Sequence, residues 1–532
     1  MPDFDKLTNE ELIEQAKQLY LEKEDLKLQL DVANGKLAKM RQDKFGSRSE
    51  KNIASDQMTL FNFDEVDELA VKEEREEERA VKSHKRRVPK KYAIDDLPDN
   101  IETETIVHDI DNKRCPECGN ELHLIKTEKH RELVYIPSSY KLVIHEYPQY
   151  GCRTCEKENG GDVYGAVKEG FLFPKSPTSA SIVAHLMTDK YLLGLPLNRS
   201  IELMHSQGIM FRDQTCAKWM IDASEQYLSK IYDKMHEYLI KEDIINADEM
   251  HYNIFTGKKD APVKKRKMKK TYIWMFRTGI TAKRAIIMYH YGGGRSGEIA
   301  TNFLSGFTGY LITDAYAGYN GVEGATRVLC NVHARRYAAD LYKEGLKKNA
   351  VVLNVLEIYR EIFHRDEAIR AELGENYEQI RIEREVHLKG LFNILFTYLE
   401  VSREFTMKNS NLYKAINYIL NVKVELTNFL KDGRLELSNN LSERTLKIVI
   451  NNRKSSLFYG SEKGATGSCI ITSVVQTAKA NNLKVEEYLT YILKYLSSHL
   501  YPTDNELKNL MPWSAYMKKR FEIKKKQPET KN

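Results

Sequence analysis

The sequence predicts a multidomain α/β protein whose largest part is a mixed sheet covered by helices. At roughly 150 residues per domain, its 532 residues suffice for three or four domains. The hydrophobic period changes from helical to strand-like after residue 242 and back again after residue 337. Between these points lie five short runs rich in β-branched and aromatic residues, separated by turn residues and followed by helices. Such a series is typical of an α/β core.

Composition excludes several protein classes. The chain is 42% hydrophobic and has no run near the roughly 18 apolar residues that a membrane span needs. The N-terminus is acidic and lacks the apolar stretch of a signal peptide. Seven cysteines in so long a chain argue against a disulfide scaffold and for a reducing compartment. We therefore expect a cytoplasmic protein that makes no membrane contact.

The first element, residues 1–50, is expected to be a leucine-zipper-like coiled coil. Apolar residues recur every seven positions, at Leu12, Leu19, Leu26, Ala33 and Met40. A heptad pattern of this kind predicts self-association into a homo-oligomer. A lone amphipathic helix packed on its own domain is the alternative.

A charged linker, residues 51–92, follows. Residues 64–79 carry a net charge of −6, and residues 82–91 carry +6. Charge blocks of this kind are usually solvated. Either block alone is as compatible with a spacer as with a nucleic-acid contact.

Residues 93–175 are predicted to form a strand-rich unit around structural zinc. Two CxxC pairs supply four thiolates, and each two-residue spacer lets both sulfurs of a pair face one ion. A redox dithiol is the main alternative. The expected zinc ligands are Cys115, Cys118, Cys152 and Cys155.

Residues 176–242 read as helical. Within them, residues 197–219 suggest a helix, a short Ser-Gln-Gly turn and a second helix ending near Trp219. DNA-binding helix-turn-helix segments have this layout, although many all-α proteins contain such a pair.

Three acids in the predicted core, residues 243–337 and 431–480, are candidate ligands of catalytic Mg²⁺ or Mn²⁺. Asp248 and Asp314 each come directly after the apolar residues of a predicted strand. If these two strands are neighbours in the sheet, both carboxylates lie close together at its end. Glu443 is expected in the second turn of a helix capped by Ser438. Carboxylate oxygens suit these ions, and two such ions can activate a nucleophile and stabilise a leaving oxygen. Each acid alone is also compatible with an ordinary polar strand or helix end.

Basic residues near these acids are candidate DNA contacts. A strand-to-helix junction carries a histidine and two arginines, which suit phosphate. The loop 258–270 carries a net charge of +7, although it is also compatible with a solubilising hairpin tip. The candidates are His333, Arg335, Arg336, Arg444, Arg453, Lys454, Lys264, Lys265, Arg266 and Lys267.

The remaining segments complete the organisation. Residues 338–430 are predicted to form a helical insertion between the two parts of the core, and residues 481–517 a C-terminal helical segment. Residues 518–532 are expected to be a disordered basic tail. Cys216, Cys330 and Cys469 are expected to be packing residues.

Taken together, the motifs resemble the insertion-sequence-66 family of DDE transposases over nearly the whole chain. The resemblance is carried by KFGSRSEK after the heptads, CPECG with GCRTC, and KYLLGLPLNR. It is continued by ADE at 247–249, TDAYAGYN at 313–320, CNVHARRY at 330–337, DGRLELSNNLSER at 432–444 and NRKSSLFYGSEKGA at 452–465.

This resemblance implies a ribonuclease H-like catalytic core interrupted by the helical insertion. It implies cleavage at the element ends and transfer of the freed 3′-hydroxyls into target DNA. Asp248, Asp314 and Glu443 match the family's metal-binding acids, and accessory proteins encoded by the same element are implied partners. Glu249 is a possible alternate acid, but its position next to Asp248 should turn it to the opposite face of the strand.

Two other hypotheses remain. A non-catalytic protein derived from a transposase would bind element ends as a repressor, and would bind DNA without Mg²⁺-dependent cleavage. A zinc-stabilised assembly protein with no role on DNA would show no salt dependence of DNA affinity.

Overall fold

The computed structural model describes residues 140–145, 149–151, 163–165, 171–174, 176–256, 267–456 and 458–523. The described residues form two compact units, those between 171 and 522 in one and residues 140–145, 149–151, 163–165 and 523 in the other. The predicted coiled coil and charged linker lie outside the described residues. Within the described ranges, no helix has both the length and the apolar character needed to cross a bilayer.

The described part of the second unit is a small antiparallel ribbon. Strands β1 (Gln149–Gly151) and β2 (Val163–Gly165) pair with Tyr150 opposite Tyr164. The chain between them contains Cys152 and Cys155, which lie outside the described residues, as do Cys115 and Cys118. The ribbon agrees with the strands predicted between residues 93 and 175.

Four helices precede the sheet, as predicted for residues 176–242. They are α4 (Ala180–Tyr191), α5 (Leu197–Ser206), α6 (Asp213–Ala223) and α7 (Ser229–Leu239), with one π-helical turn joining α6 to α7. The predicted helix pair is present, but the expected end near Trp219 is wrong. α6 continues for four residues past Trp219, which is buried and packs edge-on against Phe211 with ring centroids 4.9 Å apart.

All five strands predicted for the core are present in one mixed sheet. In space they run in the order β5-β4-β3-β6-β7, and a short strand β8 also pairs with β3. β3, β4 and β5 are antiparallel neighbours, whereas β6 is parallel to β3 and β7 is parallel to β6. The bounds are β3 (Ile244–Thr256), β4 (Lys267–Thr278), β5 (Ile287–Tyr291), β6 (Tyr310–Thr313), β7 (Thr326–Leu329) and β8 (Phe458–Tyr459).

β3 is longer than predicted. The sequence suggested that it closes at Asp248, but β3 continues to Thr256 and pairs with β4 over nearly its full length. Beyond Asp248 the strand alternates, because Tyr252 and Ile254 are buried whereas His251 is exposed. Asp248 therefore lies inside a strand and not at its end.

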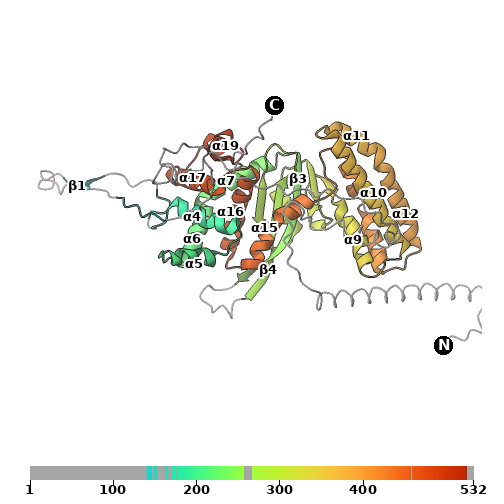
Figure 1. Cartoon of the computed structure of the whole chain (residues 1–532), viewed down its shortest axis with the longest axis horizontal. Coiled ribbons are helices and arrows are strands. Elements are labelled where there is room, and N and C mark those ends of the chain that lie inside the picture. The colour runs from blue at the N-terminus through green and yellow to red at the C-terminus, as the bar shows by residue number, and fades with distance from the viewer. Residues whose placement is uncertain are drawn as a thin grey trace, which may run out of the picture. The chain divides into compact units, whose positions relative to one another are not determined.

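Helices cover the sheet on both faces (Figure 1). On one face, α15 (Asn440–Ser456) and α16 (Glu462–Ala480) bring Leu446, Val449 and Cys469 against Met250 and Tyr252. The alternate residues of each strand point to the opposite face of the sheet. There the ring of Phe276 in β4 stacks on Phe303 of α8 (Gly297–Phe303), with ring centroids 4.3 Å apart.

The α16 helix also covers the outer edge of β5. The backbone N–H of Ile287 donates to Thr477 Oγ1 at 3.0 Å, and the N–H of Tyr289 donates to Ser473 Oγ at 2.8 Å. Side-chain hydroxyls thus occupy the positions that another strand would take. Because an unpaired edge invites pairing with other chains, this cover protects the sheet.

The helical insertion is joined to the sheet by one hydrophobic core. Ile312 of β6 and Val328 of β7 belong to the same buried cluster as Leu395 and Ile416 of the insertion. Figure 1 shows the long insertion helices side by side. The helices of the insertion are α10 (Ala350–Leu373), α11 (Tyr377–His387), α12 (Lys389–Glu404), α13 (Asn411–Asn421) and the short α14 (Lys423–Thr427), followed by the 3₁₀ turn η6 (Asn428–Lys431).

Two predicted boundaries fall inside helices. α9 (Asn331–Lys343) runs without a break across the expected start of the insertion at residue 338. After α17 (Val485–Ser498) and α18 (Asp504–Leu510), α19 (Ala515–Phe521) includes the start of the predicted basic tail. The expectation of disorder is therefore wrong for residues 518–521, where the carbonyl of Phe521 accepts from the N–H of Lys484 at 2.7 Å.

Candidate active site

Two of the three predicted acids lie on adjacent parallel strands. Asn246 of β3 is opposite Ile312 of β6, and continuing this register by two residues brings Asp314 opposite Asp248. Side chains opposite each other on neighbouring strands point to the same face. β6 ends at Thr313, so Asp314 is the first residue beyond it. The two carboxylates therefore belong to one site, although only Asp314 comes directly after a strand end.

The third acid comes to the same face from α15. Glu443 lies in the first turn of this helix, not the second, because α15 begins at Asn440. Asn439 therefore occupies the N-cap position that Ser438 was predicted to take. An acid in the first turn of a helix is favoured by the partial positive charge there.

Electrostatics connect the acids. Burial raises the pKa of Asp248 well above its usual range, and the charges of Asp314, Glu249 and Glu443 raise it further. Within the described part of the chain, no three His, Cys, Asp or Glu side chains form a ready metal-binding group. The donor set nevertheless suits a divalent cation, since Glu443 Oε2 is buried without a hydrogen-bond partner among the described residues and the neighbouring acids repel one another.

A histidine and an arginine of α9 face Glu443. Arg336 Nη2 lies 3.3 Å and His333 Nε2 lies 3.6 Å from Glu443 Oε1. Burial and then the charge of Arg336 lower the pKa of His333, against the opposing effect of Glu443 and Asp314. Arg335 is only 8% exposed. Arg336 reaches the acid through its Nη2.

Asn439 is a site residue that the sequence did not single out. Its Nδ2 donates to the carbonyl of Ala247 at 3.1 Å, and its Oδ1 accepts from Asn246 Nδ2 at 3.2 Å and from Ser442 Oγ at 2.5 Å. Its backbone N–H donates to Cys330 Sγ at 3.1 Å. Asn439 thus joins β3, next to Asp248, to the start of α15. The pair of asparagines before Glu443 was the only sequence signal for it.

Arg327 of β7 is a second site residue that the sequence did not single out, and it holds the loop that carries Asp314. Its Nη2 donates to Thr313 Oγ1 at 2.9 Å and to the carbonyl of Asp314 at 2.7 Å. The Asp314 carboxylate in turn accepts from the N–H of Tyr316 at 3.0 Å. A lone arginine in an apolar strand gave no sequence signal of this role.

Glu249 belongs to a different network. Its side chain is 1% exposed, and it accepts from Arg295 Nε at 2.8 Å and from the Tyr319 hydroxyl at 2.7 Å. The Arg295 guanidinium lies 4.0 Å from the centroid of the Tyr316 ring. Glu249 is opposite Trp274 on the face away from Asp248, which agrees with the parity expected from the sequence.

The other predicted DNA contacts are distributed more widely. Arg444 and Lys454 are exposed on α15, whereas Arg453 Nη1 donates to the His251 carbonyl at 3.0 Å. Lys267 is the first residue of β4, and Lys264, Lys265 and Arg266 lie outside the described residues. Cys216, Cys330 and Cys469 are buried and unbridged, which confirms their predicted packing role.

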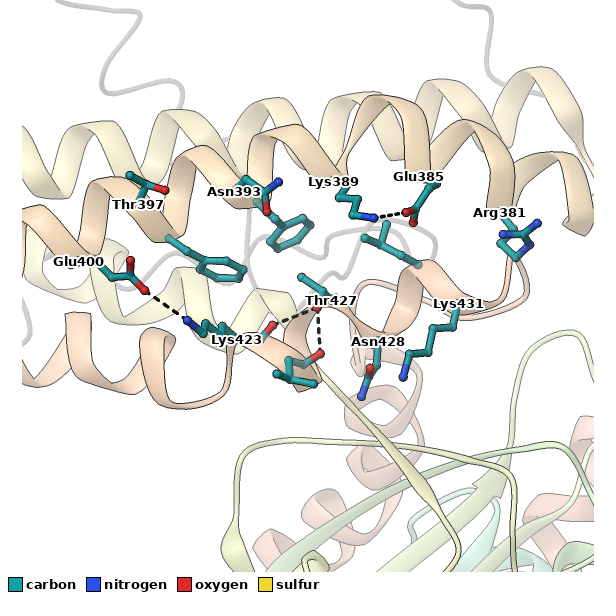
Figure 2. A pocket seen from close by; sticks show the side chains of 14 residues that line it. Arg381, Glu385, Lys389, Asn393, Thr397, Glu400, Lys423, Thr427, Asn428 and Lys431 are labelled. Carbon is teal, nitrogen blue, oxygen red and sulfur yellow. Dashed lines mark hydrogen bonds and ion pairs between the residues drawn. The ribbon is translucent and has the colours of Figure 1, made fainter.

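A groove of about 860 Å³ lies within the insertion, between α11 and α12 on one side and α14 with η6 on the other (Figure 2). Lys423 Nζ is paired with Glu400 Oε1 at 3.3 Å, and Lys389 with Glu385. None of the predicted site residues lines this groove.

Four family models match the chain. Residues 175–467 match the model described as transposase IS66 family, and residues 473–513 match the IS66 C-terminal element. Residues 112–156 match the zinc-finger binding domain of transposase IS66, which covers all four predicted zinc ligands. Residues 34–106 match the model described as Transposase C of IS166 homeodomain.

Curated relatives from Sinorhizobium fredii are similar over most of their length. Uncharacterized protein y4hP is 26% identical over 90% of this chain and 87% of its own. Uncharacterized protein y4qI is 25% identical over 89% of this chain and 87% of its own. Uncharacterized protein y4jD is 24% identical over 79% of this chain and 81% of its own. The similarity therefore extends well beyond any single motif.

Proposed function

Because the chain belongs to the IS66 transposase family, we propose that it is a catalytically active DNA transposase. It would cleave the ends of its insertion sequence and transfer the 3′-hydroxyl ends into target DNA. The observation that carries the proposal is the parallel register of β3 and β6, which, continued by two residues, brings Asp314 opposite Asp248 on the face to which α15 brings Glu443. The mixed sheet, interrupted before its third acid by an insertion, supports a ribonuclease H-like core.

Asp248, Asp314 and Glu443 would hold Mg²⁺ or Mn²⁺. A divalent cation at these acids would supply Lewis-acid stabilisation of the phosphodiester oxygens. The buried, unpartnered Oε2 of Glu443 supports cation binding here, as do the neighbouring acids, whose charges add to the effect of burial in raising the pKa of Asp248. His333 and Arg336 are near enough to Glu443 to orient a DNA phosphate beside it.

Other segments would bind partners. Cys115, Cys118, Cys152 and Cys155 would hold structural zinc, as four thiolates do in closed tetrahedral sites. The basic loop that includes Lys264–Lys267 and the helix pair at residues 197–219 would contact DNA, with the N-terminal heptads joining protomers. Accessory proteins of the same element would act beside it.

The test is cleavage and strand transfer on DNA that carries the element ends, in the presence of Mg²⁺. We expect Asp314→Asn and Asp248→Asn to lose more than about 100-fold in rate, since even partners of metal ligands typically contribute about 10–100-fold. Glu249→Gln is the matched control because Glu249 adjoins Asp248 in sequence but faces the other side of the sheet.

Undiminished activity of Asp314→Asn would overturn the assignment of the acids. Salt-dependent binding of end DNA by the wild-type protein without Mg²⁺-dependent cleavage would instead support a repressor derived from a transposase.

A further inference from the structure

We propose that Arg384 of the insertion is a positioning residue that fixes the third acid, Glu443. It would do so by clamping the segment 429–435, which leads from the insertion into α15. The inference rests on the proposed function for the role of Glu443, but the clamp itself is a property of the described contacts. It gives the insertion a part in building the catalytic site.

Arg384 is fully buried, and its donors point at one short segment. It donates to the carbonyls of Leu435 at 3.0 Å, Asp432 at 3.3 Å, Phe429 at 3.4 Å and Gly433 at 3.5 Å. Guanidinium is the only side-chain group with five N–H donors in a rigid planar fork. Lysine in its place could reach only some of these carbonyls.

Asp366 of α10 fixes the orientation of Arg384. Asp366 Oδ1 accepts from Arg384 Nε at 2.7 Å, and its Oδ2 accepts from Arg370 Nε at 3.1 Å. Arg370 also donates to the Leu435 carbonyl. Two arginines on one buried aspartate therefore hold the same carbonyl, so the clamp joins α10 and α11 to the segment.

The segment is also held against the sheet and against α11. A Cβ added at Gly433 would lie 1.9 Å from the carbonyl oxygen of Tyr377, so the backbone contact tolerates only glycine. On the sheet side, Arg434 Nη1 donates to Asp243 Oδ2 at 2.7 Å, directly before β3. The segment thus has fixed contacts with both the insertion and the sheet.

The path from the clamp to the acid is short. Asn439 follows Leu435 by four residues, and the N–H groups of Ser442 and Glu443 donate to its carbonyl at 3.0 and 3.2 Å. Glu443 Oε2 has no hydrogen-bond partner among the described residues. Apart from the contacts of Oε1 with Arg336 and His333, the position of the acid is therefore set by the backbone that carries it.

One end of the groove of the insertion, seen in Figure 2, leads into the clamped segment. Arg381, one turn before Arg384 on α11, and Lys431 of η6 lie at the same end of that groove. From this end the chain passes directly into residues 432–435. The contacts of α11 with η6 and of Arg384 with the segment are thus parts of one interface.

The test compares Arg384→Lys with Arg365→Ala in the full-length chain. Arg365 is on α10 and makes a half-exposed ion pair with Glu361 at 2.6 Å, so its loss controls for removing an arginine from the insertion. We measure Mn²⁺ binding by titration calorimetry, the affinity for end DNA, and hydrogen exchange at the amides of Ser442 and Glu443.

We expect Arg384→Lys to weaken Mn²⁺ binding by about 10–100-fold, as for other residues that orient metal ligands. The affinity for end DNA should stay within about twofold of wild type, and exchange at Ser442 and Glu443 should accelerate. Arg365→Ala should leave all three unchanged. If Arg384→Lys does not fold, Arg370→Ala replaces it, because it removes the other donor to the Leu435 carbonyl at a less buried position.

Failures of the two proposals are distinguishable. A wild-type protein that binds no Mn²⁺ would count against the proposed catalytic function, and hydrogen exchange would still test the clamp. Unchanged exchange at Ser442 and Glu443 in Arg384→Lys would overturn the clamp, as would unchanged Mn²⁺ affinity where the wild type binds the ion.

Discussion

At the scale of single residues, the Asn439 side chain links parts of the site that are almost two hundred positions apart in sequence. It is fully buried and bonds to β3 and to α15. Buried polar groups of this kind contribute most through the cost of leaving their partners unsatisfied. Asn439 should therefore matter for stability as well as for the geometry of the acids.

We expect Asn439→Ala to lower the free energy of unfolding by about 1–3 kcal/mol, because the carbonyl of Ala247 and the amide of Asn246 lose a buried partner. Urea denaturation measures the change. Asn451→Ala, at an exposed position of α15, should stay within about 0.5 kcal/mol of wild type. Equal losses in both variants would contradict the linking role.

The sequence could predict where single residues lie only where a local pattern determines their place, and their roles in a site stay predictions. Asp248 and Asp314 follow apolar runs, and neighbouring strands bring them together. No local pattern determines the roles of Asn439 and Arg327. Asn439 acts through contacts with residues about 190 positions earlier in the chain. Arg327 acts through contacts with the loop that carries Asp314. The N-cap was assigned one residue early, since Ser438 and Asn439 are both good caps and only the packing of Asn439 decides between them.

At the scale of elements, α16 completes the sheet by supplying hydroxyls to β5. Thr477 both accepts from the N–H of Ile287 at 3.0 Å and donates to its carbonyl at 3.0 Å. Thr477 is fully buried, so water cannot replace these bonds.

Thr477→Val keeps the shape of the side chain and removes both bonds. We expect a loss of about 1–3 kcal/mol in the free energy of unfolding, because two buried backbone groups are left unsatisfied. The matched control is Thr490→Val on α17, where the hydroxyl bonds only within its own helix and is exposed. A change below about 0.5 kcal/mol for Thr477→Val, by urea denaturation, would refute this account of the edge.

A histidine between α4 and α17 should make stability depend on pH. The hydrogen bond that His185 Nδ1 donates to Glu486 Oε2 is the main reason that the pKa of His185 is raised above 6.5, against the effect of burial. Because the folded-state pKa is raised, the pair stabilises the fold fully below about pH 6.5, and this contribution is lost as pH rises through the folded-state pKa.

Glu486→Gln should therefore lower the free energy of unfolding at pH 5.5 and have almost no effect at pH 8.5. The side chains of His185 and Glu486 are 32% and 48% exposed, so solvent screening limits the effect to about 0.2–1 kcal/mol. Denaturation at both pH values, in low and high salt, measures it. A larger effect at pH 8.5 than at pH 5.5 would contradict the assignment.

The elements themselves were predicted well, and their ends less so. Hydrophobic runs located all five core strands, but β3 and α6 extend further than their apolar runs suggest. β3 continues because pairing with β4 supports its polar residues, such as His251 and Asn253. The length of β3 is therefore set by its partner strand, and the composition of β3 alone could not predict it.

At the scale of the whole molecule, the insertion is not an independent domain. It shares one buried cluster with β6, β7 and α9, and the Arg384 clamp joins it to the segment before α15. The sequence suggested the insertion from its helical periodicity. It could not suggest the shared core, because the same apolar stripes would serve a separately packed bundle.

We expect the core and the insertion to unfold together. Amides in the middle of α10 and of β6 should therefore exchange through the same global opening, with free energies within about 1 kcal/mol of each other. Native-state hydrogen exchange at increasing urea measures this. Earlier opening of α10 than of β6 would show that the insertion unfolds on its own.

The cover of β5 by α16 has a consequence for synthesis on the ribosome. β5 ends at Tyr291, whereas Ser473 and Thr477 are made much later. At about 5–20 residues per second, the intervening chain takes roughly 10–40 s to appear, and the edge of β5 has no α16 during that interval. A nascent chain with an open sheet edge is prone to pair with other chains. The arrangement therefore creates a period of aggregation risk in every round of translation, and it makes chains truncated before residue 462 candidates for recognition by chaperones.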